Sequence, residues 1–389
     1  MRAGIACLVL AYVLSQFYRA FLAVLSPVLI ADLGMTPEQL ASASGLWFLA
    51  FALMQIPVGE ALDRIGPRLT ASLLLAVGGG GAALFASAQG AFAIKAAMVL
   101  IGIGCSPVLM AAYYIFARSF PPAVFGTLAG AVIGVGSLGN IGSALPLAWS
   151  AEQFGWRASM AALAIVTLAV ALAIAVFVRD PGRMAGHGKG SVLQLLRMPA
   201  LWPVLVMMVV CYYPAAGLRG LWIGPYAREV FGAGPGAIGT LTLVMGLAMV
   251  AGNFAYGPLD RLLGTRKGLV LGGNLLCALC LLALWHWPAL GGWRTAALLA
   301  GVGFFGASFP MVIAHGRAFL PHHLVGRGVT LLNFFGIGAA GLAQMVTGRL
   351  FAAVPPDPPT APFAALFLFF ALTLLAGLAI YAFARDRTD

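Results

Sequence analysis

The chain has 389 residues, of which 62% are apolar and 8% are charged. Soluble domains carry about 25% charged residues, so this chain could not cover a water-exposed surface with polar groups. The composition therefore excludes soluble proteins, soluble enzymes included, and is typical of a polytopic helical membrane protein. Because the apolar runs are continuous rather than alternating, they also argue against an outer-membrane β-barrel.

The charged residues are distributed unevenly along the chain. The formal net charge is +11, acidic residues stay at the edges of the apolar runs, and most Lys and Arg fall on one side of the membrane. By the positive-inside rule this predicts an integral protein of a bacterial inner membrane with both termini in the cytoplasm. The excess of basic residues is explained by these loops and does not indicate nucleic-acid binding. All five cysteines lie within apolar runs, which does not favour a disulfide framework.

Twelve runs are long enough to cross a bilayer core, which takes about 20 apolar residues. They are 5–30, 40–58, 69–89, 91–117, 124–148, 158–178, 200–226, 237–258, 268–288, 295–316, 328–351 and 362–384. We interpret the first run as a helix and not a signal peptide, because Arg19 interrupts it and no small-residue cleavage site follows. We expect an N-terminal six-helix bundle in 1–178, a cytoplasmic linker in 179–199 and a C-terminal six-helix bundle in 200–389.

The two halves repeat each other. Arg19 in the first span corresponds to Arg219 in the seventh, and Arg118 at the end of the fourth corresponds to Arg317 at the end of the tenth. A Gly-x-Gly-x-x-Gly pattern in the fifth span, at 134–139, recurs in the eleventh at 336–341. That pattern also spells a dinucleotide fingerprint, but it lacks the strand–turn–helix context, and we expect no cofactor. Two six-span halves in the same orientation are indicated.

The loops after spans two and eight carry the most specific motif. The first copy comprises Gly59, Asp63, Arg64, Gly66 and Arg68, and the second Gly257, Asp260, Arg261, Gly264 and Arg266. In these loops and in its repeat, the chain resembles the major facilitator superfamily over essentially its full length. The resemblance implies an all-α fold of twelve transmembrane helices in two pseudo-symmetric bundles, and secondary active transport by rocking around a central site. It also implies that both loops form a cytoplasmic gate; the alternative is that their arginines only set topology.

Two arginines, Arg19 and Arg219, lie inside apolar spans. A central arginine costs at least about 2.5–3.5 kcal/mol on insertion scales. No acidic side chain lies deep in a span, so a ligand would supply the negative charge, and the guanidinium fork suits a carboxylate or phosphate. The alternative is that each arginine bonds backbone carbonyls or reaches the interface. The sequence around the two arginines resembles that of organophosphate:phosphate antiporters and related organic-anion carriers. Pro27 follows Arg19, and Trp222, Pro225 and Tyr226 follow Arg219.

Further side chains are candidates for substrate binding. Beside the arginines stand Tyr18 and Trp222; the others are Trp47, Tyr113, Tyr114 and Asn140. For the amide the alternative is helix–helix bonding, and for the aromatic rings it is packing. His315 is the candidate for proton coupling, against a purely interfacial role. Without a buried acid, proton coupling through the substrate or His315, anion exchange and facilitated diffusion all stay open.

Two competing functions are weighed. Thioether, thiol and imidazole groups select Cu(I), and Met245, Met249, Cys277, Cys280, Met311 and His315 would fit a copper-importing branch of the same superfamily. Two cavity arginines would repel such a cation, and Met and Cys also serve as apolar filler. A non-transporting assembly factor or receptor on this scaffold is the other alternative, which the short loops disfavour. The sequence predicts a monomeric secondary active transporter of a small organic anion, by proton symport or anion exchange.

Overall fold

The computed structural model describes residues 2–181, 192–321 and 324–387, and these contain helices and no strand. The helices of the first half are α1 (Arg2–Tyr18), α2 (Phe21–Leu33), α3 (Pro37–Arg64), α4 (Pro67–Ala86), α5 (Ala91–Cys105), α6 (Val108–Ser119), α7 (Pro122–Gly142), α8 (Leu145–Phe154) and α9 (Trp156–Phe177). Those of the second half are α10 (Val192–Leu196), η1 (Pro199–Leu201), α11 (Trp202–Cys211), α12 (Tyr213–Gly217), η2 (Leu218–Trp222), α13 (Ile223–Phe231), α14 (Pro235–Leu263), α15 (Arg266–His286), α16 (Gly292–Phe305), α17 (Phe309–Arg317), α18 (Val325–Ala353) and α19 (Ala361–Tyr381).

The number of membrane spans agrees with the prediction. Eleven helices in the described part of the chain are long and apolar enough to cross a membrane, and a bent pair makes a twelfth. That pair consists of Ala3–Tyr18 and Phe21–Leu33, which meet at 46°. The expected single helix over 5–30 is therefore two helices. The apolar pattern runs on through the break, so hydropathy could not reveal it.

Local signals account for where several helices begin and end. Thr36 caps α3 by accepting a hydrogen bond from the backbone N–H of Gln39, whose side chain accepts one from the Thr36 N–H in return. This reciprocal pair satisfies two amide groups that a helix start would otherwise leave bare. The turn from α3 to α4 passes through Gly66, whose φ of +102° is a conformation that suits glycine.

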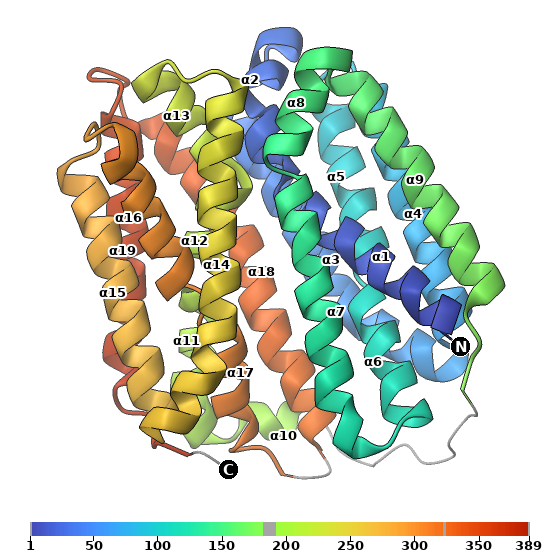
Figure 1. The fold of residues 1–389 in the computed structure, drawn as a ribbon. Coiled ribbons are helices and arrows are strands. Elements are labelled where there is room, and N and C mark those ends of the chain that lie inside the picture. The colour runs from blue at the N-terminus through green and yellow to red at the C-terminus, as the bar shows by residue number, and fades with distance from the viewer. Residues whose placement is uncertain (1, 182–191, 322–323, 388–389) are drawn as a thin grey trace.

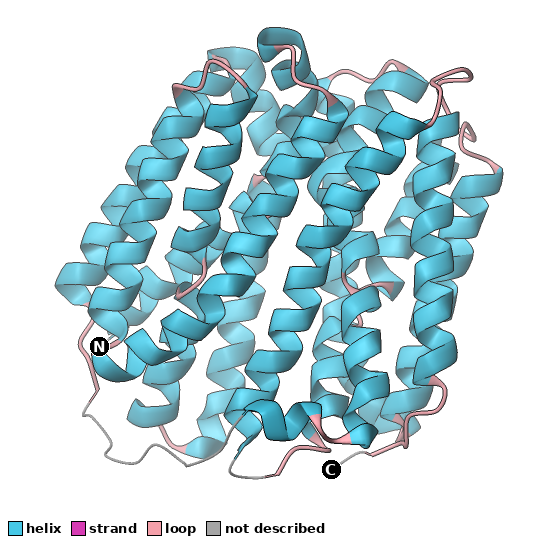
Figure 2. Cartoon of the chain, turned by 180° about the vertical axis from the view of Figure 1, so that it is seen from behind, coloured by secondary structure: helices cyan, strands magenta, loops and turns pink. Residues whose placement is uncertain are grey.

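The two halves stand side by side, the first half in blue to green and the second in yellow to red (Figure 1). The view from behind shows that the described chain consists of helices joined by loops (Figure 2). Both ends of the described chain lie toward the same side of the helices, which we call the termini side; the other is the opposite side. The boundaries expected at 178 and 199 stay a prediction, and residues 182–191 of the expected linker lie outside the described residues.

On the opposite side the halves pack closely at glycines. In α3, a Cβ on Gly45 would come 2.6 Å from the backbone oxygen of Gly341 in α18. In α13, Gly224 lies directly against the backbone oxygen of Ala23 in α2, and at the start of α14, Gly239 lies against α8. Small residues let membrane helices approach in this way. Each contact joins the first half of the chain to the second.

Candidate anion-binding site

The two intramembrane arginines lie at irregular points of their spans. Arg19 stands in the break between α1 and α2, and Arg219 is part of the π-helical turn η2. A Cβ on Gly220 would come 3.2 Å from the backbone oxygen of Arg19, so the arginines meet where the first and seventh spans cross. π-turns and broken membrane helices are frequent at functional sites because they alter the direction of side chains and backbone groups.

The Arg19 side chain has partners from both halves. Its Nη1 donates a hydrogen bond of 3.1 Å to the hydroxyl of Tyr212 in the second half. The guanidinium carbon lies 5.5 Å from the ring centre of Trp47 and 5.2 Å from that of Phe51, both on α3. Aromatic faces stabilise a cation at such distances. The Nε of Arg19 is buried without a partner.

The Arg219 side chain is more buried and less satisfied. It is 4% exposed, and its Nε and Nη1 are buried without hydrogen-bond partners. Gly246 of α14 lies beside it, with an added Cβ 3.9 Å from Nη1. The positive charges of Arg19 and Arg219 are close enough to repel each other, and the Tyr212 hydroxyl lies within electrostatic reach of both.

Acidic side chains do not balance these charges in the described part of the chain. The salt bridges found there join Arg64 to Glu60, Arg118 to Asp63, and Arg266 to Asp260, and none includes either central arginine. Burying an uncompensated guanidinium is costly. A carboxylate, sulfonate or phosphate between the two arginines would accept from the unused donors and offset their positive charge.

Two further predicted residues keep unused polar atoms. The Nε1 of Trp47 and the Oδ1 of Asn140 are buried without partners. The Trp47 ring also faces the guanidinium of Arg19, so this unused N–H belongs to a residue that contacts Arg19. The amide oxygen of Asn140 comes from α7, in the same half.

The remaining predicted aromatic residues have contacts of their own. Tyr18 exchanges a 2.9 Å hydrogen bond with Thr167 of α9, within the first half. The ring of Tyr114 is covered by Arg118, whose guanidinium carbon is 3.8 Å from the ring centre. Tyr113 lies beside it on α6 and is partly exposed. Their part in substrate binding stays a prediction.

Trp222 lies in the π-turn and is bonded to span eleven; its part in substrate binding stays a prediction. Ordinary α-helical spacing would put it on the face of Arg219. The π-turn changes that spacing, and the indole Nε1 donates 3.1 Å hydrogen bonds to both Gln344 and Thr347 of α18. Its ring also packs against Phe351, 5.0 Å between centres. Trp222 therefore links span seven to span eleven, between the arginines and the opposite side of the molecule.

Tyr212 was absent from the sequence-based candidates. The internal repeat contains the signal that finds it, because Tyr12 precedes Arg19 by the same seven residues as Tyr212 precedes Arg219. Tyr12 accepts a 3.0 Å hydrogen bond from Gln16 and lies against Gly136 of α7. The arginines and these tyrosines thus form a pseudo-symmetric set of four.

His315 lies away from the arginines, toward the termini side between α17 and α19. Its Nε2 is 3.0 Å from the backbone oxygen of Arg385, and its Nδ1 is 2.6 Å from the Tyr381 hydroxyl. Nε2 can donate to the carbonyl while Nδ1 accepts from the hydroxyl, so a neutral ring satisfies both contacts. Its role in proton coupling stays a prediction.

The two motif loops lie on the termini side, with each described ion pair inside one half. Gly59, Asp63 and Arg64 belong to the last turns of α3, and Gly66 and Arg68 to the start of α4. Gly257, Asp260 and Arg261 belong to the end of α14, Gly264 is the C-cap of that helix, and Arg266 begins α15. The backbone N–H of Arg68 donates to Asp180, after α9, at 2.8 Å. Asp386, after α19, accepts from the Lys267 N–H at 3.0 Å. The acids that cap these helix starts are thus Asp180 and Asp386, and the gating role stays a prediction.

The residues of the metal alternative have packing and backbone contacts, and their part in metal binding stays a prediction. Among the described residues no group of three or more His, Cys, Asp or Glu side chains could hold a metal ion. Cys277 points its thiol at the backbone oxygen of Val302, 3.7 Å away. Met245 and Met249 pack against Gly303 of α16.

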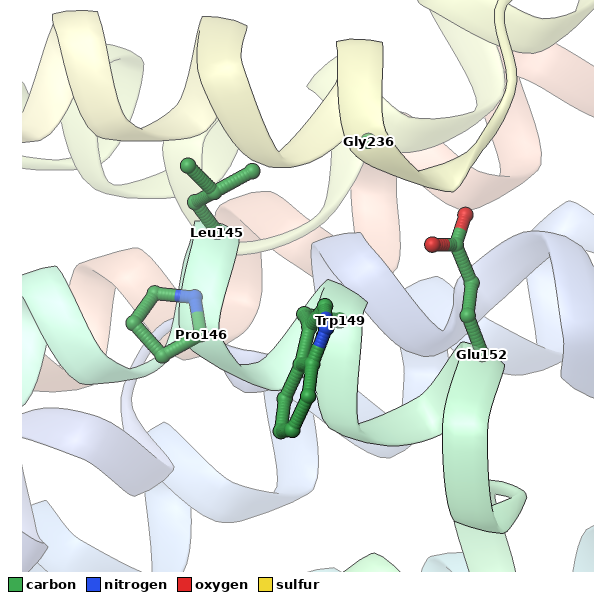
Figure 3. A pocket seen from close by; sticks show the side chains of 5 residues that line it. All are labelled: Leu145, Pro146, Trp149, Glu152 and Gly236. Carbon is green, nitrogen blue, oxygen red and sulfur yellow. The ribbon is translucent and has the colours of Figure 1, made fainter.

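A pocket with a volume of about 380 Å³ lies elsewhere, on the opposite side between α8 and α14 (Figure 3). It is lined by Leu145, Pro146, Trp149, Glu152 and Gly236. The lining is apolar apart from Glu152, and neither arginine contributes to it. We assign it no part in anion binding.

These features define the class of the molecule, a polytopic helical membrane protein with a paired cationic site where its halves cross. A family model described as the Major Facilitator Superfamily matches residues 8–223, more than half of the chain. The chain belongs to the Major Facilitator Superfamily. Its family and fold are those of transporters, which are not enzymes.

Several relatives are named as transporters of organic acids. A sialic acid transporter of Escherichia coli is 23% identical over 95% of this chain and 92% of its own length. A gentisate transporter of Corynebacterium glutamicum is 26% identical over 83% of this chain and 75% of its own. A probable sulfoacetate transporter of Cupriavidus necator is 22% identical over 68% of this chain, and the match spans 65% of that relative.

Solved structures share the fold at low identity. A bacterial homolog of the human lysosomal transporter Spinster, inward-facing and occupied, superposes with a TM-score of 0.78 at 18% identity, covering 98% of this chain and 96% of the other. A D-xylose–proton symporter gives a TM-score of 0.79 at 15% identity, covering 99% and 98%. Both confirm the predicted transporter fold.

Proposed function

We propose that this transporter carries a small organic anion, which Arg19 and Arg219 bind from opposite halves. The observation that carries the proposal is the buried Arg219 side chain, 4% exposed, with two donor nitrogens unused beside a second guanidinium. A carboxylate, sulfonate or phosphate group of the substrate supplies the missing acceptor. Transport follows alternating access of the two halves around this site.

The relatives support an anionic substrate. Sialic acid, gentisate and sulfoacetate, the solutes in their names, are all organic acids. They differ in size and in the body attached to the acid group. The group they share is the one that the arginine pair would recognise, while the rest of the substrate would contact other residues.

The orientation follows from the charge distribution. We place the termini side in the cytoplasm of a bacterial inner membrane, because the basic loops gather there. The glycine contacts between halves then lie on the external side, so the described state is closed externally. The loops at 59–68 and 257–266 would close the cytoplasmic side in the alternate state.

The coupling mode is either anion exchange or proton symport. An empty carrier retains two adjacent positive charges, whereas a bound anion offsets their repulsion and draws both halves together. This favours reorientation of the occupied carrier, which is the behaviour of an exchanger. Proton symport would use the substrate or His315. In proteoliposomes, uptake driven by internal anion without a pH gradient indicates exchange, and uptake that needs the pH gradient indicates symport.

The first experiment measures the thermal stability of the purified carrier with single ligands. The panel holds sulfoacetate, gentisate, sialic acid, inorganic phosphate, D-xylose and Cu(I). A ligand at 100 times its dissociation constant adds about 2.7 kcal/mol to stability. We expect one class of anion to raise the melting temperature of the wild type and of Arg228→Gln, an exposed arginine later in the same span, but not of Arg219→Gln.

Either of two results would reject the anion site. The first is stabilisation by an anion that survives in both Arg19→Gln and Arg219→Gln. The second is stabilisation by Cu(I) alone, lost in Met245→Leu, which would favour the copper importer. If no solute stabilises the protein and none is transported by it, the result would favour the assembly-factor or receptor alternative.

A further inference from the structure

Gln344 of α18 holds both ends of the π-turn that carries Arg219. It is 2% exposed. Its Nε2 donates to the backbone oxygen of Gly217, just before the turn, at 3.3 Å. Its Oε1 accepts from the Nε1 of Trp222, the last residue of the turn, at 3.1 Å. One amide thus fixes the beginning and the end of η2.

The same amide reaches across to the first half. Its Nε2 also donates to the hydroxyl of Ser44 on α3 at 3.3 Å. This contact lies next to Gly45 and Gly341, where the backbones of α3 and α18 approach most closely. Thr347 completes the cluster by accepting from Trp222 and donating to the backbone oxygen of Gln344.

We propose that Gln344 is a positioning residue that couples closure of the opposite side to the placement of Arg219. While the halves are packed there, the Ser44 contact holds the amide, the amide holds the π-turn, and the turn keeps Arg219 beside Arg19. When the halves separate on that side, the Ser44 bond breaks and the turn is released. The coupling concerns closure and the arginine; its effect on substrate rests on the proposed anion site.

Closure is measured through a buried reporter. Ser26 of α2 is 0% exposed and packs against Gly224 on the opposite side. In a chain with its five cysteines replaced, Ser26→Cys reacts with a membrane-impermeant maleimide only when that side opens. Gln344→Met removes the amide at similar volume, and Ser44→Ala removes only the contact between halves. Asn274→Leu is the matched control, because that buried amide bonds Val270 and Ser308 within the second half.

We expect maleimide labelling to rise roughly threefold to tenfold in Gln344→Met and in Ser44→Ala, the range that one buried hydrogen bond supports. Asn274→Leu should leave the rate unchanged. An unchanged rate in Gln344→Met, or an equal rise in Asn274→Leu, would overturn the coupling.

The link to Arg219 is measured without any ligand. A double-mutant cycle compares the melting temperatures of Gln344→Met, Arg219→Met and the double variant. Residues that share a structural element give non-additive effects, whereas independent residues add. We expect non-additivity for Gln344 with Arg219 and additivity for Asn274 with Arg219. An additive result for Gln344 and Arg219 would overturn the positioning role, even if every test of anion binding succeeded. If anion binding failed, the double-mutant cycle would still decide whether Gln344 positions Arg219.

Discussion

Arg19 and Arg219 correspond in the internal repeat, yet their surroundings differ. Arg19 donates to a hydroxyl and faces two aromatic rings. Arg219 is 4% exposed, and two of its donor nitrogens have no partner. The repeat thus specifies where the charges stand, while the packing of each half decides how far each charge is satisfied. Arg19 is held in place by protein groups, and Arg219 keeps the unused donors that the proposed anion would fill.

The difference comes from the neighbouring spans. Trp47 and Phe51 lie one turn apart on α3 and stack with centres 5.3 Å apart, so they form a continuous aromatic surface for Arg19. Beside Arg219, α14 presents Gly246, which has no side chain to cover the guanidinium. An aromatic residue at 246 would occupy the space that a ligand group needs.

The largest expected effect is loss of transport in either arginine variant. In proteoliposomes, Arg19→Gln and Arg219→Gln should each lower uptake of the stabilising anion at least about 100-fold, because one charge-assisted pair of hydrogen bonds is lost from a buried site. Arg228→Gln should transport normally. Full uptake by folded Arg19→Gln would contradict the assignment.

Replacing the two arginines should change the melting temperature of the empty carrier in opposite directions. Replacing even a buried ion pair by apolar side chains of similar volume is often neutral or stabilising, by up to about 4 kcal/mol, and a guanidinium without a counter-ion has no such attraction to lose. Arg219→Met should therefore raise the melting temperature in low-salt buffer. Arg19→Met removes a hydrogen bond and two aromatic contacts and should lower it. Equal shifts of the same sign would show that the two sites are equivalent.

Tyr212 and Tyr12 test the same difference between the two arginine sites, with a smaller expected change in stability. Tyr212→Phe removes the hydroxyl that accepts from Arg19, and a hydrogen bond to a charged group contributes about 1.5–3 kcal/mol. Tyr12→Phe loses only a neutral bond from Gln16, worth about 0.5–1.5 kcal/mol. Melting curves should show the larger loss for Tyr212→Phe. A larger loss for Tyr12→Phe would place the essential hydroxyl in the first half.

The sequence predicted the spans, the repeat and both arginines, because each depends on hydropathy or on residue correspondence. It could not reveal the break at Arg19 or the π-turn at Arg219, since both interrupt helices whose apolar pattern is continuous. Trp222 was predicted from α-helical spacing, which a π-turn alters, and its part in substrate binding stays a prediction. Tyr212 was within reach of the repeat, whereas the bond from Gln344 to Ser44 joins residues 300 apart in the chain and depends on how the halves pack.

The smallest expected change in stability concerns the aspartates that follow spans six and twelve. Asp180 accepts from the Arg68 N–H and lies against Gly66, and Asp386 accepts from the Lys267 N–H and from the Thr265 hydroxyl. Partial burial raises the pKa of Asp386, but these two donors and the nearby positive charges outweigh it, so the pKa lies below its usual value. A carboxyl with a depressed pKa in the folded chain stabilises it above the unfolded value, and that contribution is lost as the pH falls through the folded pKa.

Asp386→Asn should therefore melt slightly below the wild type at pH 7. The two curves should begin to converge below about pH 4, where Asp386 of the unfolded chain takes up its proton, and should meet only below the lowered pKa of the folded chain. The side chain is exposed, so solvent screening keeps the difference small. Asp180→Asn serves as the structural counterpart from the first half. A difference between wild type and Asp386→Asn that stays constant from pH 7 to pH 3 would mean that the contact depends on side-chain shape and not on the charge of Asp386.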